Sequence, residues 1–397
     1  MDNQKYLGIS ISELEKSGGK HTAKEIKQQP KLWLETFELL SSQKDQIAAF
    51  LENAFSFTNI RVILTGAGTS SFIGNILQAP FQKNTGKNTW AIATTDLVSH
   101  PQLYFDREIP TLLISFARSG NSPESIAAVD LADKLCENVF HLIITCNPAG
   151  KLAARPSPGD KSLIILMPPE SDDQSLAMTG SFTCMLLTGI LISRLQKLDS
   201  LKSQVKRLAD YGNQVIQNYP KKLQELARLD FDRAVFLGSG PLQGTARESH
   251  LKLQELTDGK VICKFDSFLG FRHGPKAVIN PSTLLIYLFS NNEYALQYEG
   301  DLVKAINAGE KGKAQIGISE SAIPDLSLDL AITMSGDSEK IEEEFLSVCS
   351  VVPAQILGFF KSCELGLQPD SPSANQTITR VVEGVNIYPF TFPGDSV

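Results

Sequence analysis

An internal repeat limits the folds open to this chain more than any other feature of its sequence. Residues 60–68, IRVILTGAG, are echoed by residues 232–240, DRAVFLGSG. Residues 111–114, TLLI, recur unchanged as residues 283–286. Both pairs have the same offset, since 238 − 66 = 172 and 283 − 111 = 172. Two matches at one offset predict that a single structural unit occurs twice in the 397 residues.

Each copy alternates strands with helices. The first reads as the strands RVILTGAG, TWAIATTD, TLLISFA and VFHLIITCN, with the helix SPESIAAVDLADKLC between the last two. The second reads as RAVFLGSG, the helix QGTARESHLKLQELT, and then VICKF, TLLIYLFS and AQIGISE. Such short β-branched runs between helices are typical of buried parallel strands. We therefore predict an α/β protein with two tandem doubly wound parallel-sheet domains of flavodoxin-like, three-layer αβα type. Ligands of such sheets bind beyond the carboxyl ends of the strands.

The remaining segments are placed around the two copies. The N-terminal residues are predicted to form helices that break at Gly18, Gly19 and Pro30. Near the C-terminus, QPDSPSANQTIT is typical of a loop that could cover a site. The expected boundaries are 1–56 for a helical N-terminal extension, 57–197 for the first domain, 198–230 for a charged helical linker, 231–360 for the second domain and 361–397 for the tail.

Charge and cysteine content exclude several kinds of partner. A net charge of −7 argues against nucleic acid, whose binding needs a basic surface. None of the six cysteines lies in a CxxC pair or at ligand spacing from a histidine, so we expect free thiols, no metal site and a reducing, cytoplasmic compartment. The N-terminus lacks the pattern of a secretory signal. Residues 176–195 are the most membrane-like stretch, but their Ser and Thr content favours a buried helix, so no membrane partner is expected.

A loop rich in hydroxyl groups follows the strand TLLIS. In FARSGNSPES, Pro123 suits the first position of a helix and Ser122 suits its N-cap. Backbone N–H groups, a helix N-terminus, hydroxyls and an arginine would converge on one point, which is what a phosphate dianion requires. Ordinary capping around a turn is the alternative. The candidate phosphate ligands in this loop are Arg118, Ser119, Gly120, Asn121 and Ser122.

Two further hydroxyl clusters are candidates for the same phosphate site. Thr69 and Ser70, in GAGTSS, leave the first strand at the same edge of the predicted sheet. Thr179, in TGSFT, precedes another helix, where simple capping explains it equally well. In the second copy the offset of 172 places FSNNEY where the first copy has ARSGNS. The second copy lacks the glycine, arginine and proline of this loop, so we expect only the first copy to hold phosphate.

Acid–base chemistry is expected in the second copy. Glu248, Lys252 and Glu255 lie at i, i+4 and i+7 in ARESHLKLQEL, and hence on one face of a helix. A lysine beside two carboxylates would keep one of them ionised as a base, although a solvated, salt-bridged stripe has the same spacing. His273, in FRHGPK, is the one histidine of five in a turn flanked by Gly and Pro. It is a further catalytic candidate, with a purely structural histidine as the alternative.

The motifs GAGTS, SFARSGNSPES, ARESHLKLQE and FRHGPKAV, in this order, resemble those of the sugar isomerase (SIS) domain family. The two tandem copies resemble the isomerase half of glucosamine-6-phosphate synthase. The closest likeness is to the AgaS group, known as tagatose-6-phosphate ketose/aldose isomerases or galactosamine-6-phosphate deaminases. The resemblance covers nearly the whole chain. It implies two SIS domains, with phosphate contacts from Ser70, Ser119 and Ser122 and with Arg118 in place of a polar amide.

The resemblance also implies roles for the catalytic candidates. Glu255 would move a proton between C1 and C2 of the sugar, and His273 would open the sugar ring. Glu248 and Lys252 would support them. In the family the histidine often reaches the site from a second subunit, which implies a homodimer with shared active sites. The expected reaction converts galactosamine-6-phosphate to tagatose-6-phosphate and ammonia, and it needs neither a metal nor a cofactor.

The tail departs from the synthase pattern. The synthase forms a Schiff base through a lysine in its tail, whereas this chain has no lysine after Lys361. Asn375, Gln376 and Thr377 occupy the corresponding stretch. Covalent catalysis by the tail is therefore not expected. No glutaminase domain is recognised in these 397 residues, so we do not expect ammonia to be made here from glutamine.

Three other functions are weighed against this reaction. A plain tagatose-6-phosphate (ketose/aldose) isomerase would use the same residues. A non-enzymatic sugar-phosphate sensor is disfavoured because Glu255 and His273 are both present and no DNA-binding segment is evident. A dinucleotide dehydrogenase is disfavoured because GAGTSSFIG lacks GxGxxG spacing. In addition, Asp96 lies 96 − 68 = 28 residues beyond Gly68, against about 20 expected.

Overall fold

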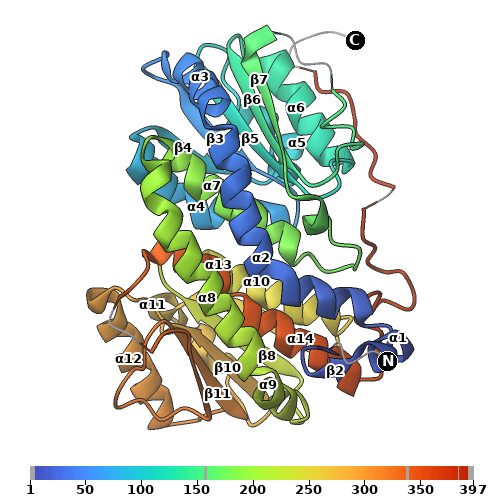
Figure 1. Cartoon of the computed structure of the whole chain (residues 1–397), viewed down its shortest axis with the longest axis vertical. Coiled ribbons are helices and arrows are strands. Elements are labelled where there is room, and N and C mark those ends of the chain that lie inside the picture. The colour runs from blue at the N-terminus through green and yellow to red at the C-terminus, as the bar shows by residue number, and fades with distance from the viewer. Residues whose placement is uncertain (1–4, 156–158, 337–338, 383, 392–397) are drawn as a thin grey trace.

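The computed structural model describes residues 5–155, 159–336, 339–382 and 384–391, which contain two five-stranded parallel sheets (Figure 1). The first sheet has the order β4–β3–β5–β6–β7, and the second, taken from its other edge, has the order β9–β8–β10–β11–β12. The predicted pair of α/β units is confirmed. The strands of the first sheet are β3 Arg61–Thr65, β4 Asn88–Ala91, β5 Thr111–Ala117, β6 Val139–Thr145 and β7 Ser162–Leu166. Those of the second are β8 Arg233–Gly238, β9 Ile262–Ser267, β10 Thr283–Leu288, β11 Ala314–Ser319 and β12 Leu330–Thr333.

The sequence repeat is also a repeat in structure. Strands β3 and β8 begin at Arg61 and Arg233, and strands β5 and β10 begin at Thr111 and Thr283, so both pairs keep the offset of 172. The register is conserved as well, because Arg61 pairs with Thr111 and Arg233 pairs with Thr283. The two central strand pairs of the sheets are therefore equivalent residue by residue.

Helices cover both faces of each sheet, and α4 and α10 pack against each other between the two units (Figure 1). Gly244 permits this close approach, because a Cβ at that position would lie 2.9 Å from the backbone nitrogen of Ile76. One apolar core runs through both units, with a smaller core on the outer face of each sheet. The helices of the first unit are α4 Thr69–Thr85, α5 Thr94–Ser99, α6 Pro123–Leu135 and α7 Gly180–Ser193. Those of the second are α10 Pro241–Leu256, α11 Phe268–Phe271, α12 Glu293–Asn307, α13 Glu343–Cys349 and α14 Val352–Glu364.

The N-terminal segment and the segment between the copies add further helices. A short antiparallel pair, β1 Lys5–Tyr6 and β2 Ile9–Ser10, precedes them. Helix α2 contacts α7 of the first unit and α14 of the second, and it runs beside α8 across both units (Figure 1). It therefore ties the two units together. These helices are α1 Ile11–Ser17, α2 Lys20–Ser42, α3 Lys44–Phe55, α8 Lys202–Asn218 and α9 Pro220–Ala227.

Of the two helix breaks predicted near the N-terminus, one is confirmed and one is wrong. Gly18 adopts φ 62° and ends α1, as a left-handed C-cap requires. Pro30, however, lies inside α2. Proline cannot donate to the carbonyl four residues earlier, and here the carbonyl of Ile26 accepts a hydrogen bond from Nε2 of Gln29 instead. The side chain of a neighbour thus satisfies the group that the proline leaves free.

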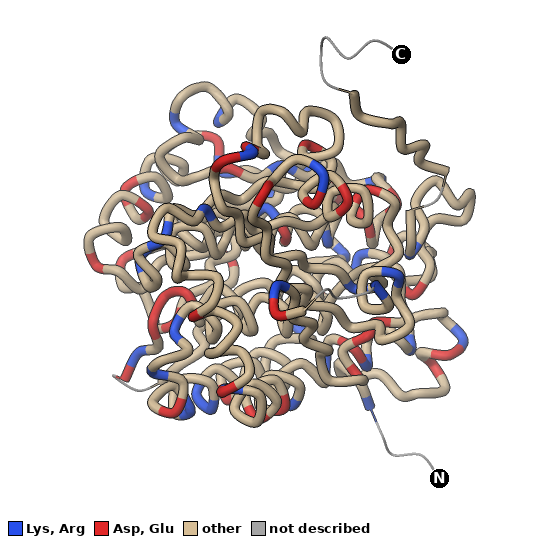
Figure 2. The backbone as a smooth tube through the Cα atoms, turned by 90° about the horizontal axis from the view of Figure 1, so that it is seen from above, with Lys and Arg blue, Asp and Glu red and all other residues tan. Residues whose placement is uncertain are grey.

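Apolar and charged residues are distributed as in a globular fold. Helix α7, predicted as a buried helix, is buried at every residue. The segment Glu343–Glu364 is long and apolar enough to cross a membrane, but its most apolar window is 100% buried inside the protein. Acidic and basic residues are interspersed along the backbone in Figure 2. The tail leaves α14 near the second unit and runs along one side of the molecule to the first unit (Figure 1).

Candidate active site

A cavity of about 500 Å³ lies at the carboxyl edge of the first sheet. Loops after β3 and β5, the C-terminal half of α10 and the tail enclose it, so both repeats contribute to one site. Among the residues that line it are Gly68, Thr69, Ser70, Arg118, Ser119, Ser122, Ser125, Leu176, Met178, Lys252, Glu255 and the tail residues 376–382.

The loop after β5 has the predicted geometry. Pro123 is the first residue of α6 and Ser122 is its N-cap. The Ser122 side chain makes no capping hydrogen bond, so its hydroxyl is left for a ligand. Gly120 takes a left-handed φ of 65°, and Asn121 accepts a hydrogen bond from the backbone of Lys151 at 3.0 Å. Gly120 and Asn121 therefore shape the loop but do not line the cavity, whereas Ser119 and Ser122 do.

The first turn of α4 forms the opposite wall. Gly66 is required here, because a Cβ would lie 2.6 Å from the backbone carbon of Ser70. The nearest polar partner of the Ser70 hydroxyl is the sulfur of Met178, at 3.9 Å, so this hydroxyl has no strong partner among the described residues. Ser125, in the first turn of α6, also lines the cavity. Its place in a helical turn after the loop was visible in the sequence, but it was not among the predicted phosphate ligands.

Arg118 lines the cavity, and its guanidinium is already engaged. Nη1 donates to the carbonyls of Ser175 and Leu176, each at 3.1 Å, and Nη2 donates to the carbonyl of Arg380 at 2.5 Å. Burial lowers the pKa of Arg118, and the nearby Asp173 carboxylate opposes this shift. Arg118 therefore holds the wall of the cavity together and is also part of the predicted phosphate-binding loop.

Thr179 is not brought to the cavity wall. Its hydroxyl and backbone N–H both donate to the carboxylate of Asp173, at 3.1 and 2.7 Å. Asp173 also accepts from the backbone of Gly180 and Ser181, the first residues of α7. An aspartate at a helix N-terminus explains this arrangement. Thr179 occupies the N-cap position of α7, but its side chain makes no capping bond, and Asp173 caps the helix instead.

The three charged residues of α10 lie together on one face, as their spacing predicts. Lys252 Nζ lies 2.7 Å from Glu255 Oε2 and 3.2 Å from Glu248 Oε1. Thr69, from the first repeat, completes the cluster, with its Oγ1 3.0 Å from Lys252 Nζ and 3.3 Å from Glu248 Oε1. The side chains of Lys252 and Glu248 are fully buried, while that of Glu255 is 23% exposed and faces the cavity. The cluster is therefore a buried ion network, not a solvated stripe.

The pKa values of Glu248 and Lys252 are both shifted by their surroundings. Burial raises the pKa of Glu248 to about 8, which the charge of Lys252 opposes and that of Glu255 reinforces. Burial also lowers the pKa of Lys252, but the two carboxylates outweigh it and the net shift is upward. A cationic Lys252 beside a cavity-facing Glu255 is an arrangement that orients a general base.

His273 is not brought to the cavity of its own chain. It is exposed in the turn after α11, where its backbone N–H donates to the carbonyl of Gly270 at 3.0 Å. It does not line the cavity formed by the described residues. Within one subunit the base candidate and the histidine are therefore separate. Among those described residues, no group of three or more His, Cys, Asp or Glu could hold a metal ion.

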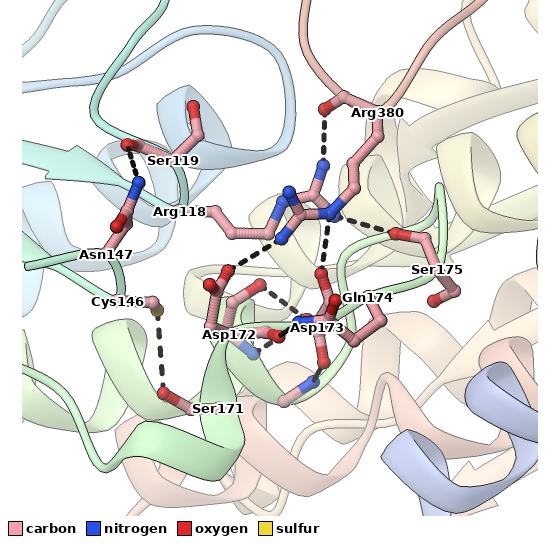
Figure 3. Close-up of polar contacts among 12 residues, drawn as sticks. Arg118, Ser119, Cys146, Asn147, Ser171, Asp172, Asp173, Gln174, Ser175 and Arg380 are labelled. Carbon is pink, nitrogen blue, oxygen red and sulfur yellow. Dashed lines mark hydrogen bonds and ion pairs between the residues drawn. The ribbon is translucent and has the colours of Figure 1, made fainter. Parts of the chain in front are cut away.

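A polar network beside the cavity was missed by the sequence analysis (Figure 3). Arg380 of the tail donates through Nε to the carbonyl of Asp173 at 2.8 Å and through Nη2 to Asp172 Oδ1 at 2.7 Å. Behind it, Glu25 of α2 accepts from the backbone and hydroxyl of Ser175. Burial, together with the Asp173 charge, raises the pKa of Glu25 to about 7. The Asp-Asp pair ahead of a helix was the only sequence signal for this network.

In the second copy, carboxylates occupy the position that corresponds to the loop after β5 in the first copy. Ser290, at the offset of Arg118, donates its backbone N–H to Glu299 Oε2 at 2.9 Å and its hydroxyl to Glu343. Glu299 is fully buried, and burial raises its pKa to about 7. A phosphate would meet these acidic groups instead of an open, hydroxyl-lined loop. This arrangement supports the prediction that phosphate binds only in the first copy.

Comparison with known proteins agrees with this fold. Residues 57–192 match the model of the SIS domain family. The D-galactosamine-6-phosphate deaminase AgaS of Shewanella sp. (strain ANA-3) is 40% identical over 394 residues, which are 97% of this chain and 96% of that protein. A crystal structure from Clostridium novyi NT is 42% identical with a TM-score of 0.95, covering 98% of this chain and 100% of that one. The tagatose-6-phosphate ketose/aldose isomerase structure from Escherichia coli is 34% identical with a TM-score of 0.85, covering 94% and 98%.

The repeated parallel sheets and the single shared cavity define a tandem SIS-domain protein. The likeness to AgaS extends over nearly the full length of both chains, beyond the SIS fold itself. This chain belongs to the AgaS family.

Proposed function

We propose that this protein is an amino-sugar-6-phosphate deaminase that converts galactosamine-6-phosphate to tagatose-6-phosphate and ammonia. The observation that carries the proposal is the position of Glu255. Its carboxylate faces the same cavity as the Ser119 and Ser122 loop and is held by the buried Lys252 at 2.7 Å. The relative from Shewanella sp. bears the name of this activity.

The phosphate end of the substrate is assigned to the first repeat. Ser70, Ser119 and Ser122 present hydroxyls to the cavity, and the N-terminus of α6 supplies backbone N–H groups. Arg118 adds a positive charge to the same wall. These groups would fix the 6-phosphate and leave C1 and C2 toward Glu255.

The reaction then requires one proton transfer and one hydrolysis. Glu255 takes the proton from C2 of the open-chain 2-amino aldose while O1 takes a proton from water, which gives an enolamine. Glu255 then returns its proton to C1, and the nitrogen releases one proton to water. The product carries an imine at C2. Water adds to this imine and ammonia leaves, so the ketose keeps the oxygen from water. Lys252 holds the Glu255 carboxylate beside the cavity through their 2.7 Å ion pair, and Glu248 and Thr69 hold the ammonium group of Lys252 from the other side.

We assign ring opening to His273 of a second subunit, which requires a homodimer, because the same histidine lies outside its own cavity. The tail residues at the cavity, including Gln376 and Thr377, offer no amine, so the tail does not hold the sugar as a Schiff base. Six unpaired cysteines agree with a cytoplasmic setting.

A plain ketose/aldose isomerase is the second candidate, because the Escherichia coli relative bears that name. The two are separated by incubating the protein with galactosamine-6-phosphate, glucosamine-6-phosphate and tagatose-6-phosphate, and measuring ammonia and ketose in each sample. The deaminase yields equal amounts of ammonia and ketose, with galactosamine-6-phosphate preferred. Isomerisation of tagatose-6-phosphate without ammonia from either amino sugar supports the isomerase. Binding without turnover of any of the three supports a sensor.

A further inference from the structure

The tail is attached to the cavity at few points. Upstream, Asp370 accepts from the backbone and hydroxyl of Thr22 at the start of α2, each at 2.7 Å, which fixes the root of the tail. Within residues 374–382, which the structure describes in full, Arg380 alone hydrogen-bonds to residues outside the tail. These tail residues form one wall of the cavity. Farther along the tail, Phe390 accepts a hydrogen bond from Lys134 Nζ at 2.7 Å and packs against the core of the first unit. Between these two anchors, within residues 374–382, Arg380 supplies the hydrogen bonds that join the wall to the rest of the protein.

Arg380 is held from two sides (Figure 3). Its guanidinium reaches the Asp173 carbonyl at 2.8 Å and the Asp172 carboxylate at 2.7 Å, and both belong to the body of the first unit. Its own carbonyl accepts from Arg118 at 2.5 Å. Arg118 directly precedes Ser119 in the phosphate loop, so the loop and the tail share a single guanidinium. A lysine could not reproduce both side-chain contacts of Arg380, because it lacks the planar fork.

Charge favours this closed arrangement most when an anion is present. Two guanidinium groups lie close together, and Arg380 lowers the pKa of the buried Arg118 whereas Asp173 opposes that shift. A phosphate dianion beside Ser119 and Ser122 would attract both cations and so favour the position of Arg380 seen here.

We propose that Arg380 is a positioning residue that latches the tail over the cavity, and that Arg118 couples this closure to phosphate in the loop. This coupling rests on the proposed function, in which the loop after β5 binds the phosphate group of the sugar. Closure shields the enolamine from bulk solvent while the proton moves between C2 and C1. Because such coupling is reciprocal, phosphate stabilises the closed tail by the same factor by which the closed tail tightens phosphate binding.

The test is amide hydrogen exchange of residues 374–382 in the full-length protein, with and without saturating inorganic phosphate. In the wild type, phosphate should slow exchange about tenfold, a usual size for coupled sites. R380Q should exchange fast in both conditions, and R380K should lie between them. R118Q keeps the Arg380 contacts to Asp172 and Asp173, but its tail should no longer respond to phosphate. R228Q, which alters an exposed arginine paired with Glu364, should behave as the wild type.

A second measurement checks reciprocity. R380Q should raise the Kd of inorganic phosphate by the factor of protection seen in the wild type, while its kcat falls and its melting temperature stays close to that of R228Q. Protection of the R380Q tail equal to that of the wild type would overturn the latch. A wild-type tail that ignores phosphate, although phosphate binds, would overturn the coupling. Neither readout depends on ammonia release, so the latch and the deaminase assignment can fail separately.

Discussion

Lys252 of α10 donates a hydrogen bond to Thr69 of α4 across the interface between the two repeats, with 3.0 Å between Nζ and Oγ1. The same ammonium group is paired with Glu255 at 2.7 Å. The position of the proposed base is therefore set partly by the first repeat, which also carries the proposed phosphate-binding loop after β5. This hydrogen bond connects the acid–base cluster on α10 with the first turn of α4.

Replacing Thr69 by Val should lower kcat roughly tenfold or more, because Lys252 would lose a buried hydrogen-bond partner. T69S keeps the hydroxyl and is the matched control, expected to stay near wild-type activity. The measurement is steady-state turnover of galactosamine-6-phosphate with a thermal melt of each variant. Equal kcat values for T69V and T69S would contradict a role for this contact.

Removing the Ser122 hydroxyl should weaken phosphate binding without disturbing the helix, since that hydroxyl makes no capping bond. For S122A we expect the Kd of inorganic phosphate, measured by calorimetry, to rise about tenfold, the usual cost of one hydrogen bond to a charged ligand. Ser71 provides the control, because its hydroxyl bonds to the carbonyl of Gly68 and does not line the cavity. If S71A weakened phosphate binding as much as S122A, the loop assignment would be wrong.

Arg247 should position the two repeats relative to each other. Its guanidinium lies 4.4 Å from the ring centre of Phe72 in α4 and 5.4 Å from that of Phe265 in β9, and it donates to Asn75 of α4 at 2.7 Å. In R247M these contacts, worth on the order of 1–2 kcal/mol, are lost. We expect a lower kcat and a lower melting temperature, with an unchanged Kd for inorganic phosphate.

We expect this separate effect on kcat because the proposed phosphate ligands all belong to the first repeat. R247K, which keeps the charge, should recover part of the lost activity. A change in phosphate affinity as large as the change in kcat would show that Arg247 acts on the loop and not on the interface between the repeats.

Much of this architecture could be predicted from local patterns. The strands could be recognised by their short β-branched runs, and the 172-residue offset fixed the equivalence of β3 with β8. Helical spacing alone placed Glu248, Lys252 and Glu255 on one face. The Ser122-Pro123 pair marked the start of α6 correctly. Each of these depends on residues that are close in sequence, where periodicity and capping preferences act.

What could not be predicted depends on contacts between distant segments. Arg380, Asp173 and Glu25 meet in one network although more than a hundred residues separate each from the next, and no spacing rule links them. The engagement of Arg118 by three carbonyls is invisible for the same reason. Pro30 was wrongly predicted to break its helix, because the compensating bond from Gln29 depends on a side-chain rotamer.

Glu299 should make the stability of the second unit depend on pH. Its pKa is raised from 4.5 to about 7 on folding, so the folded state binds this proton more tightly than the unfolded state. The resulting stabilisation is fully present below pH 4.5 and is lost as the pH rises through about 7. E299Q should therefore remove up to roughly 3 kcal/mol of the change in unfolding free energy across this window.

The measurement is urea unfolding of the wild type and E299Q at several pH values. E293Q alters an exposed glutamate at the start of the same helix and serves as the control. A pH dependence of E299Q identical to those of the wild type and E293Q would contradict the raised pKa.

The central claim is that Glu255 moves the proton that leads to ammonia release. Its most direct test is to measure ammonia and tagatose-6-phosphate in the same sample of galactosamine-6-phosphate, with the wild type and with E255Q, alongside calorimetric binding of inorganic phosphate. We predict equal amounts of both products from the wild type. E255Q should lose turnover by at least about a thousandfold, in the range expected for a general base, and should still bind phosphate. Undiminished ammonia release by a folded, phosphate-binding E255Q would contradict the account.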